Sequence, residues 1–291
     1  MTSPKSILVV GATGKQGSAV VRSLVALGHP ASDISFLTRN PSSPAAVKLE
    51  QKGCKPVQGS LSDVESLKRA LEGKDAVFLV TTIPPKDEPV EEEQGRNLIS
   101  AATAVEPAPF VVFTSVADAS PSCGIPHFES KARVEESLKD SGLGWCILRP
   151  VAFYDNLPKA SGIGEMMGLG LFDAALRGKK LQMVACDDIG HFAARALLDP
   201  EKYSKRVIPL AGDELTMEEA RAAYCKVENK SPWLVWKAWV PRYALWLLPY
   251  DMRMMFYFFH NKGYSVNIPE VKAEHAELLS FEDWLHKPDE E

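Results

Sequence analysis

His127 and Lys131 stand four residues apart in the segment PHFESK, residues 126–131. This spacing places two side chains on one face of a helix, provided that the helix extends back to His127. Because Pro126 precedes the histidine, His127 lies either in the first turn or before it. An imidazole there could act as the acid or base of a proton transfer, and it could equally be a cap or a packing residue. These two residues are our first candidates for catalysis.

The segment LRPVAFYDNL, residues 148–157, adds the candidates Tyr154 and Asp155. Their phenol and carboxyl groups could take part in an acid–base step. A turn or helix cap is the alternative role for Asp155, and we prefer that role for Asn156. Glu129 is a further candidate, whereas Arg149 could simply pair with a carboxylate. The predicted catalytic set is His127, Lys131, Tyr154 and Asp155.

A cofactor site is indicated by SILVVGATGKQGSAVV, residues 6–21, in which Gly11, Gly14 and Gly17 follow an apolar run and open a helical pattern. The first glycine permits a tight turn, the second lets backbone approach a pyrophosphate, and the third lets helix and strand pack closely. The helix N-terminus then offers N–H groups and a positive dipole end to the phosphates. Since the triplet follows a strand and begins a βαβ series, we predict dinucleotide binding.

Arg39, which stands 22 residues after Gly17, predicts which dinucleotide binds. In NAD-binding proteins an acid at the end of the second strand bonds the ribose 2′-hydroxyl. A guanidinium instead fits a 2′-phosphate bidentately, and Lys15 adds a second cation in the glycine turn. The sequence therefore favours NADP(H) over NAD(H), although Arg39 could also be a solvated charge at a strand end.

Short apolar runs that alternate with helical patterns must position these residues. The expected strands are 7–10, 34–38, 75–81, 110–115 and 145–150. Helices are expected near 16–27, from residue 62 or 63 onward, near 88–104 and around 129–139. Strands that are apolar on both faces and separated by helices indicate an α/β protein. The predicted fold is a Rossmann-type doubly wound parallel sheet with a smaller, mainly helical C-terminal lobe.

The chain resembles the NmrA-like family of atypical short-chain dehydrogenases. GATGKQG (residues 11–17) is similar to the family's glycine loop, and LTRN (37–40) to the end of its second strand. EQGRNLISAA (93–102), PHFESK (126–131), LRPVAFYDNL (148–157), DDIGHFAARAL (187–197) and LLSFEDWL (278–285) resemble its later motifs. One departure is Ser60, which stands where relatives usually carry an acid near the adenine.

The resemblance implies an NADP(H)-binding domain over residues 1–153 and a smaller substrate- or partner-binding lobe over residues 154–291, which closes a cleft over the nicotinamide. The segment near 182–210 is expected to pack back on the first domain. By motif position, the implied cofactor-binding residues are Gly11, Thr13, Gly14, Lys15, Gln16, Gly17, Arg39, Thr81, Thr82, Lys131, Pro150, Val151 and Phe153.

The proton donor of orthodox short-chain dehydrogenases is a tyrosine four residues before a lysine, and none of the seven tyrosines here has that lysine. At the matching position the chain has His127, four residues before Lys131. Reduction of a ketone is thereby disfavoured. Reduction of a C=N or polarised C=C bond places less demand on a phenol, and a non-redox acid–base step with NADP as a scaffold also fits.

Eleven of the aromatic residues fall between Trp233 and Tyr264. Trp233, Trp236, Trp239, Tyr243 and Trp246 have helical spacing, which puts the rings on one face. Most such stripes belong to a core, but this one also fits a pocket for an apolar, ring-containing ligand. A surface for a protein partner is the competing use.

Composition limits the possible partners and compartment. A net charge of -5 does not favour direct binding of nucleic acid. Five dispersed cysteines without a CxxC pair suggest reduced thiols, so we expect a cytoplasmic protein, with the nucleus as the other compartment considered, and no metal site. Charges and prolines interrupt the apolar segment 235–259, so no membrane span is expected. The oligomeric state stays open.

Two functions from different classes fit these features. The first is an NADP(H)-dependent or NADP(H)-scaffolded enzyme that acts on a small hydrophobic ring-containing compound, such as a nitrogen-containing natural product. The second is a catalytically silent NADP(H)-sensing regulator that binds a protein partner such as a transcription factor. The aromatic segment favours the enzyme, and the missing tyrosine favours the regulator.

Overall fold

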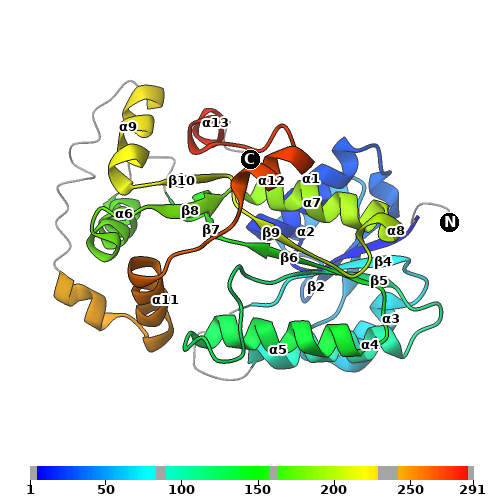
Figure 1. Ribbon diagram of the computed structural model, residues 1–291. Helices are drawn as coiled ribbons and strands as arrows, with labels where there is room; N and C mark the ends of the chain where they lie inside the picture. Colours follow the sequence, from blue (N-terminus) through cyan, green and yellow to red (C-terminus); the bar gives the residue numbers. More distant parts are fainter. Residues whose placement is uncertain (1–4, 83–89, 158–162, 229–241, 288–291) are drawn as a thin grey trace. The chain divides into compact units, whose positions relative to one another are not determined.

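The computed structural model describes residues 5–82, 90–157, 163–228 and 242–287 (Figure 1). Its contacts divide the chain into two compact units. Unit 1 comprises residues 1–123, 127–149 and 189–208, and unit 2 comprises residues 124–126, 150–188 and 209–291. The division after residue 149 lies close to the domain boundary that the sequence suggests after residue 153. Each unit is described below by itself.

Unit 1 is built on a seven-stranded sheet with the order β3-β2-β1-β4-β5-β6-β9. The pairings from β3 to β6 are all parallel. With β1 central and the chain winding outward to both sides, this order is the Rossmann order. The strands are β1 (Ile7–Val9), β2 (Ile34–Thr38), β3 (Lys55–Gln58), β4 (Ala76–Leu79), β5 (Phe110–Thr114), β6 (Trp145–Pro150) and β9 (Arg206–Leu210).

Helices cover both faces of this sheet (Figure 1). Three of them, α3, α4 and α5, share one apolar core with the strands, in which Leu67, Leu98 and Val134 are fully buried. On the other face α1 and α7 meet where a Cβ on Gly190 would lie 2.5 Å from the backbone of Ala19. The helices are α1 (Lys15–Ala26), η1 (Ala31–Asp33), α2 (Pro44–Gln51), α3 (Val64–Leu71), α4 (Val90–Thr103), α5 (Pro126–Asp140), α7 (Cys186–Leu198) and α8 (Pro200–Tyr203).

The predicted fold class is confirmed, and the strands show why it could be predicted. Every residue of β1, β4 and β5 is buried, which requires cover on both faces of the sheet. The sequence analysis did not predict α2. In that helix the Ser43 side chain accepts from Ala46 N, and Pro44 occupies the first turn, where a missing N–H costs nothing.

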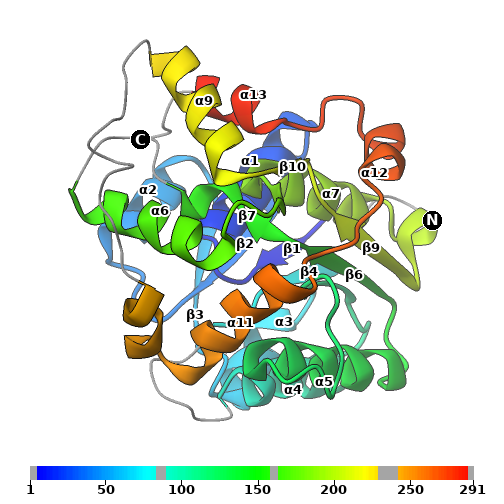
Figure 2. The same ribbon diagram turned by 60° about the vertical axis from the view of Figure 1, so that its left-hand side comes forward.

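Unit 2 contains a three-stranded sheet with the order β10-β8-β7. β7 pairs with β8 in parallel, and β10 pairs with β8 antiparallel. In Figure 2 helix α6 lies beside α11. The elements are β7 (Ala152–Phe153), η2 (Tyr154–Asn156), α6 (Ile163–Leu176), β8 (Leu181–Val184), β10 (Asp213–Leu215), α9 (Met217–Glu228), η3 (Arg242–Leu247), α11 (Tyr250–Asn261), α12 (Ile268–Glu274) and α13 (Phe281–His286).

The structure describes only part of the aromatic segment that the sequence analysis singled out. Trp233, Trp236 and Trp239 lie outside the described residues. Trp246 lies in the last turn of the short 3-10 helix η3, where its side chain is 76% exposed, and Phe256 and Phe259 are buried in α11. Phe256 and Phe259 pack on Phe172 of α6, so this part of the segment serves partly as core. Among the helices described, none is long and apolar enough to cross a membrane.

Candidate cofactor and active site

The turn between β1 and α1 has the conformation that its glycines predict. Gly11 has φ +68, a left-handed value that glycine adopts without strain. Gly14 N donates to Gly11 O at 2.9 Å, and Ser18 N then donates to Gly14 O, also at 2.9 Å, as the first bond of the helix. The chain thus leaves the strand in one tight turn and enters α1 at Lys15.

This turn fits a dinucleotide pyrophosphate. The N-cap residue Gly14 has no side chain to cap α1, and the first turn holds no acid. The N–H groups that open a helix have no acceptor within it, so an anion is well placed there. A Cβ on Gly17 would lie 2.2 Å from Gly11 O, so no larger residue permits this approach of helix to loop. Thr13 and Lys15 are exposed beside it.

Arg39 follows the last residue of β2 and is exposed. β2 pairs with β1 in parallel, from Ile7 beside Ile34 to Val9 beside Phe36, so the two strands end at the same edge of the sheet. Within the described residues the guanidinium of Arg39 has no hydrogen-bond or ion-pair partner. Its donors are therefore available to a ligand phosphate at the edge where α1 begins.

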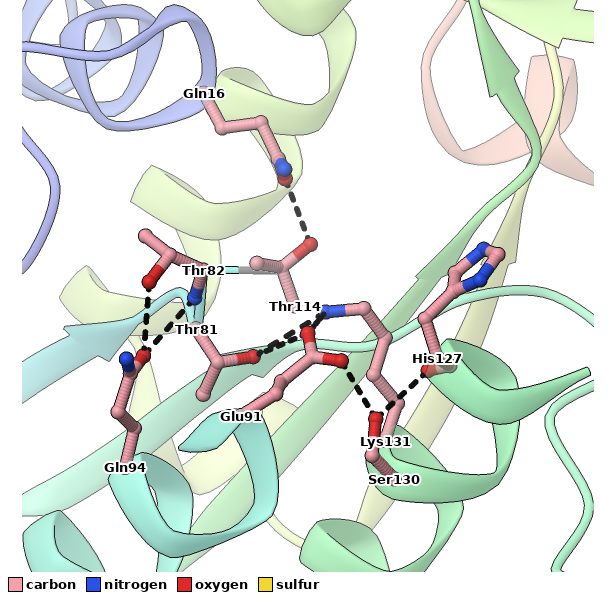
Figure 3. Close-up of polar contacts among 9 residues, drawn as sticks. All are labelled: Gln16, Thr81, Thr82, Glu91, Gln94, Thr114, His127, Ser130 and Lys131. Carbon is pink, nitrogen blue, oxygen red and sulfur yellow. Dashed lines mark hydrogen bonds and ion pairs between the residues drawn. The ribbon is translucent and has the colours of Figure 1, made fainter. Parts of the chain in front are cut away.

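Threonines 81 and 82 continue β4 at the same edge, and each is fixed by a side chain of α4 (Figure 3). Thr81 Oγ1 donates to Glu91 Oε1 at 2.9 Å. Thr82 donates to Gln94 Oε1 through both its backbone N, at 3.0 Å, and its Oγ1, at 3.1 Å. The predicted ribose-side loop is thus held by buried acceptors.

Gln16 joins the same edge to β5. Thr114 Oγ1, at the end of β5, donates to Gln16 Oε1 at 2.7 Å (Figure 3). Because the amide oxygen is engaged, the amide nitrogen of Gln16 is the group left to donate elsewhere. The first turn of α1, β4 and β5 therefore meet at one carboxyl edge, which is where ligands bind in sheets of this type.

Lys131 lies in the middle of this edge, paired with Glu91. Lys131 Nζ is 2.7 Å from Glu91 Oε1, and the side chains are only 12% and 4% exposed. Lys131 Nζ also donates to Thr81 Oγ1 at 3.3 Å. Ser130 Oγ donates to the second oxygen, Glu91 Oε2, at 2.5 Å (Figure 3). An ammonium has three donors. Among the described residues the third N–H of Lys131 has no hydrogen-bond acceptor, and Nζ lies 5.9 Å from the ring centroid of Phe113.

Glu91 stays ionised in spite of its burial. Burial by itself would raise the pKa of Glu91, but the charge of Lys131 and hydrogen bonds from Lys131, Ser130 and Thr81 outweigh it and lower the pKa. Glu91 is therefore a fixed negative charge beside a fixed positive one. Such a pair is stable in a low-dielectric site because each ion has its partner and its hydrogen bonds.

Close packing of α4 on α5 brings these partners together. A Cβ on Gly95 would lie 2.6 Å from both methyl groups of Val134, so the glycine allows the helices to approach. One turn before Gly95 stands Glu91, and one turn before Val134 stands Ser130. The ion pair thus depends on a small residue in the EQGRNLISAA motif.

His127 lies in the first turn of α5, so the helix does extend far enough to include it. Ser130 Oγ donates to the backbone oxygen of His127 at 3.1 Å. The imidazole packs edge-on against Phe128, with ring centroids 4.7 Å apart. In Figure 3 the His127 ring points away from the Glu91–Lys131 pair. His127 thus shares the helix face with Lys131, and its backbone oxygen contacts the Ser130 hydroxyl that also bonds Glu91.

Arg149 has the alternative role that the sequence left open. Its Nε donates to Glu135 Oε1 at 2.8 Å and its Nη2 to Glu135 Oε2 at 2.6 Å. This bidentate pair lowers the pKa of the buried Glu135 carboxyl, against the opposing effect of burial. Arg149 is therefore engaged in a structural pair between β6 and α5.

Several predicted site residues belong to unit 2. Pro150 and Val151 are buried, and Val151 N donates to Leu210 O at 3.0 Å. Phe153 is half-buried and pairs with Val184 in the small sheet. Their expected place beside a nicotinamide stays a prediction.

The two catalytic candidates of unit 2 have structural surroundings. Tyr154 is fully buried, with its ring centroid 5.4 Å from that of Phe281 and 5.8 Å from that of Trp284. Burial first, and then the charges of neighbouring aspartates, raise the pKa of Tyr154 well above its usual range. Asp155 Oδ2 accepts from Cys186 N, the first residue of α7, at 2.9 Å. These surroundings favour packing for Tyr154 and capping for Asp155.

The sequence analysis missed Glu91, Gln94 and Ser130. Glu91 and Gln94 stand on the helix face that also carries Leu98, at spacings of three and four residues. An acid on the buried face of an amphipathic helix needs a partner, and this signal could have identified Glu91. Among the described residues no group of three or more His, Cys, Asp or Glu side chains is placed to hold a metal ion.

Comparison with known proteins gives a family match over nearly the whole chain. The model described as the NmrA-like family matches residues 3–285. The NAD(P)H azoreductase of Xenophilus azovorans is 30% identical over 219 residues, which cover 75% of this chain and 72% of that protein. Matches to the first curated relatives span 63% to 72% of the relatives' own length. The chain thus spans about two thirds of those proteins.

Solved structures share the fold. The NADPH-dependent quinone oxidoreductase of Escherichia coli, solved with NADPH, has a TM-score of 0.73 and 23% identity, and the match covers 96% of this chain and 98% of that one. The negative transcriptional regulator NmrA has a TM-score of 0.71 and 19% identity, with 99% and 95% covered. The predicted cofactor, NADP(H), is confirmed by these relatives: the quinone oxidoreductase was solved with NADPH, and the azoreductase is named for NAD(P)H.

Proposed function

The chain belongs to the NmrA-like family, and from this premise we propose that it binds NADP(H) and reduces a C=N or C=C bond of a small, hydrophobic, ring-containing compound. A nitrogen-containing natural product is one such compound. The observation that carries the proposal is Lys131, a buried ammonium with one unused donor at the carboxyl edge where α1 begins. A non-redox acid–base step with the nucleotide as a scaffold is the second reaction that fits this site.

The residues of unit 1 that would hold the nucleotide differ in their tasks. The α1 N-terminus, from Gly14 to Gly17, would bind the pyrophosphate through backbone N–H groups. Arg39 would bind the 2′-phosphate, because its exposed guanidinium can donate two parallel hydrogen bonds. Thr82 and the free donor of Lys131 would meet the ribose hydroxyls. When bound, NADPH supplies a hydride.

Glu91 and Thr81 hold the Lys131 ammonium at one place. Two N–H groups of Lys131 are directed at Thr81 Oγ1 and Glu91 Oε1, so the direction of the third N–H group is restricted. A charge held in this way can orient a bound hydroxyl or stabilise a partial negative charge that forms near it. Glu91 acts through Lys131, so it is a positioning residue.

The type of bond reduced follows from the proton donors that the chain has. No tyrosine stands four residues before Lys131, so a ketone would lack the phenol that protonates its oxygen. A cationic C=N bond needs no proton to accept a hydride. For a C=C bond, His127 in the first turn of α5 would deliver the proton to carbon.

The names of the relatives agree with a reductase of this kind. One is an NAD(P)H azoreductase, so its named activity is on an N=N bond. One structural neighbour is a quinone oxidoreductase, and quinones are conjugated ring compounds. Both names describe transfer of reducing equivalents to an unsaturated compound, which supports a reductase, but neither names a C=N or C=C bond.

The experiment is an assay of NADPH oxidation at the nicotinamide absorbance with iminium, enone and simple ketone compounds. We expect turnover with an iminium or an enone and none with a ketone. Turnover of ketones alone would contradict the proposed bond type. No turnover of any compound in the panel by a chain that binds NADPH would contradict the proposed reductase.

A regulator is the second candidate, favoured by the missing tyrosine and by the likeness to the transcriptional regulator NmrA. Such a protein would bind a protein partner, for example a transcription factor, with an affinity that depends on the oxidation state of NADP(H). Capture of one partner with an affinity that differs between NADP+ and NADPH, without turnover, would favour this function over the enzyme.

A further inference from the structure

Unit 2 contains a cavity of about 550 Å³ that none of the predicted catalytic or cofactor-binding residues line, although Trp246 of the aromatic segment does. Its walls come from the end of α6, from η3 and from α11, with Arg177, Trp246, Tyr250, Arg253 and Tyr257 among them. This volume lies within the range of small-molecule pockets, about 300–1,000 Å³. The cavity is therefore large enough for a compound of two or three rings.

Three aromatic residues of this cavity are open to solvent, whereas Phe256 is buried. Trp246 is 76% exposed, Tyr257 64% and Tyr250 54%. Exposure of large aromatic rings to water is unfavourable. A cluster of exposed rings marks a binding site more often than a single exposed ring does. Tyr250, Arg253 and Tyr257 recur at helical spacing, so they present one face of α11.

Charge in the cavity is of one sign. Among the described lining residues there are two guanidinium groups, on Arg177 and Arg253, and no carboxylate. The guanidinium carbon of Arg253 lies 5.7 Å from the Trp246 ring centroid and 5.8 Å from that of Tyr250. Its Nε is buried, and within the described residues it has no hydrogen-bond partner.

A buried, unpaired donor costs free energy unless a ligand or water accepts its hydrogen bond. The rings next to Arg253 interact with its cation through their faces and accept no conventional hydrogen bond, so its Nε still lacks an acceptor among the residues that the structure describes. A carboxylate or sulfonate would accept two of these N–H groups in parallel. Its aromatic body would meanwhile cover Trp246, Tyr250 or Tyr257.

From these observations we propose that unit 2 binds a small aromatic anion, a carboxylate or sulfonate on a ring system, in the cavity of α6, η3 and α11. Arg253 binds the anionic group, Arg177 adds a second positive charge, and the exposed rings bind the apolar body. This site requires no nucleotide and stands apart from the proposed reductase function.

The probes are two dyes with the same ring system, one with a sulfonate group and one without. 8-Anilinonaphthalene-1-sulfonate carries the sulfonate, and N-phenyl-1-naphthylamine is the same ring system without it. Both fluoresce when they leave water, so each can be titrated into the full chain without NADP(H). We expect the sulfonate dye to bind at one site and about tenfold or more tighter than the neutral dye, as a charge-assisted bidentate pair allows.

Substitutions of single arginines test which residues bind the sulfonate group of the dye. Arg253→Gln should weaken the sulfonate dye about tenfold and leave the neutral dye within about twofold, since only the charge-assisted bonds are lost. Arg177→Gln should weaken the same dye by a smaller factor. Arg69→Gln is the matched control, because Arg69 is an exposed arginine at the end of α3 in unit 1. It should change neither titration.

Equal affinity of the two dyes for the wild-type chain would overturn the proposal, because it would show an apolar surface without anion recognition. Equal losses in Arg253→Gln and Arg69→Gln would overturn it as well, because net charge would then explain the binding. If Arg253→Gln does not fold, by its circular dichroism, Arg177→Gln decides the matter: an unchanged sulfonate affinity in that variant contradicts the site. Failure of the NADPH assay bears on none of these outcomes.

Discussion

The carboxylate of Glu91 lies 2.7 Å from the ammonium of Lys131, with both side chains almost completely buried between α4 and α5. The pair joins the helix after β4 to the helix after β5, 40 positions apart in the chain. Because both ions are desolvated, the cost of losing one partner is much larger than for a pair on the surface. Stability is therefore the first property that tests this arrangement.

Glu91→Gln should lower the free energy of unfolding by about 3–5 kcal/mol at pH 7, because it leaves a buried ammonium without its counter-charge. Chemical denaturation followed by circular dichroism measures this. The matched control is Glu92→Gln in the same turn of α4, since Glu92 pairs with the more exposed Arg96 and Arg133. The control should cost at most about 1 kcal/mol.

The double variant Glu91→Gln, Lys131→Met removes both ions. It should recover most of the stability that Glu91→Gln loses, since no unpaired charge is left in the site. If the double variant is as unstable as the sum of the two single variants, the ions do not interact, and the pair described here does not exist in solution.

The pH dependence of stability has a sign that follows from the same pair. The pKa of Glu91 is lowered in the folded chain, so its contribution is fully present above the ordinary pKa of glutamate, about 4.3. This contribution is lost as the pH falls through the lower, folded pKa. The difference in unfolding free energy between the wild type and Glu91→Gln should therefore begin to shrink as the pH falls toward the ordinary glutamate pKa of about 4.3, and continue to shrink as the pH falls through the lower, folded pKa. A difference that grows toward acid would contradict the lowered pKa.

The elements that could be predicted from the sequence are those whose signal lies within the element itself. The strands that begin at Ile34, Phe110 and Trp145 were predicted to within a residue, since each is an apolar run between turn signals. The short helix that begins at Pro44 was not, because two turns of small and polar residues carry little periodicity.

Some site residues could likewise be predicted from local sequence, and others could not. The glycine turn and Arg39 are local features of one βαβ unit and could be read directly. Glu91 could not be told from Glu92 and Glu93 by type, because the partner that distinguishes it comes from another helix. Tyr154 and Asp155 were chosen for their chemistry, but their surroundings are set by residues such as Phe281 and Cys186 that lie far away in the chain.

The glycine turn gives a third prediction. Gly17→Ala would place a Cβ 2.2 Å from Gly11 O, so helix and loop must separate. We expect a loss of about 2 kcal/mol or more of stability, in the range of an overpacked core. Gly14→Ala is the control, since its Cβ would lie at an acceptable 3.4 Å and its φ is -97. Thermal unfolding compares the two, and equal melting temperatures would contradict the close approach.

Cofactor choice gives a fourth prediction. Arg39→Asp should weaken the binding of NADP+ by about 10-fold to 100-fold, because a charge-assisted bond of about 1.5–3 kcal/mol is replaced by repulsion. Binding of NAD+ should stay equal or improve, since an acid can accept from a 2′-hydroxyl. Isothermal titration with both nucleotides measures this selectivity. An equal loss for both would mean that Arg39 does not recognise the 2′-phosphate.

His127 gives the last prediction, because it shares the α5 face with Lys131 while its ring points away from the Glu91–Lys131 pair (Figure 3). If it delivers a proton, His127→Ala should lower the turnover of an enone by about 100-fold, the lower limit for general acid catalysis, and leave NADPH affinity unchanged. Turnover of a cationic iminium should hardly change, since hydride addition to it needs no proton. The folded double variant without Glu91 and Lys131 serves as the comparison: it should lose turnover of both compounds, because the ammonium that orients the site is absent. Equal effects of His127→Ala on enone and iminium would assign the histidine to packing against Phe128 rather than to proton transfer.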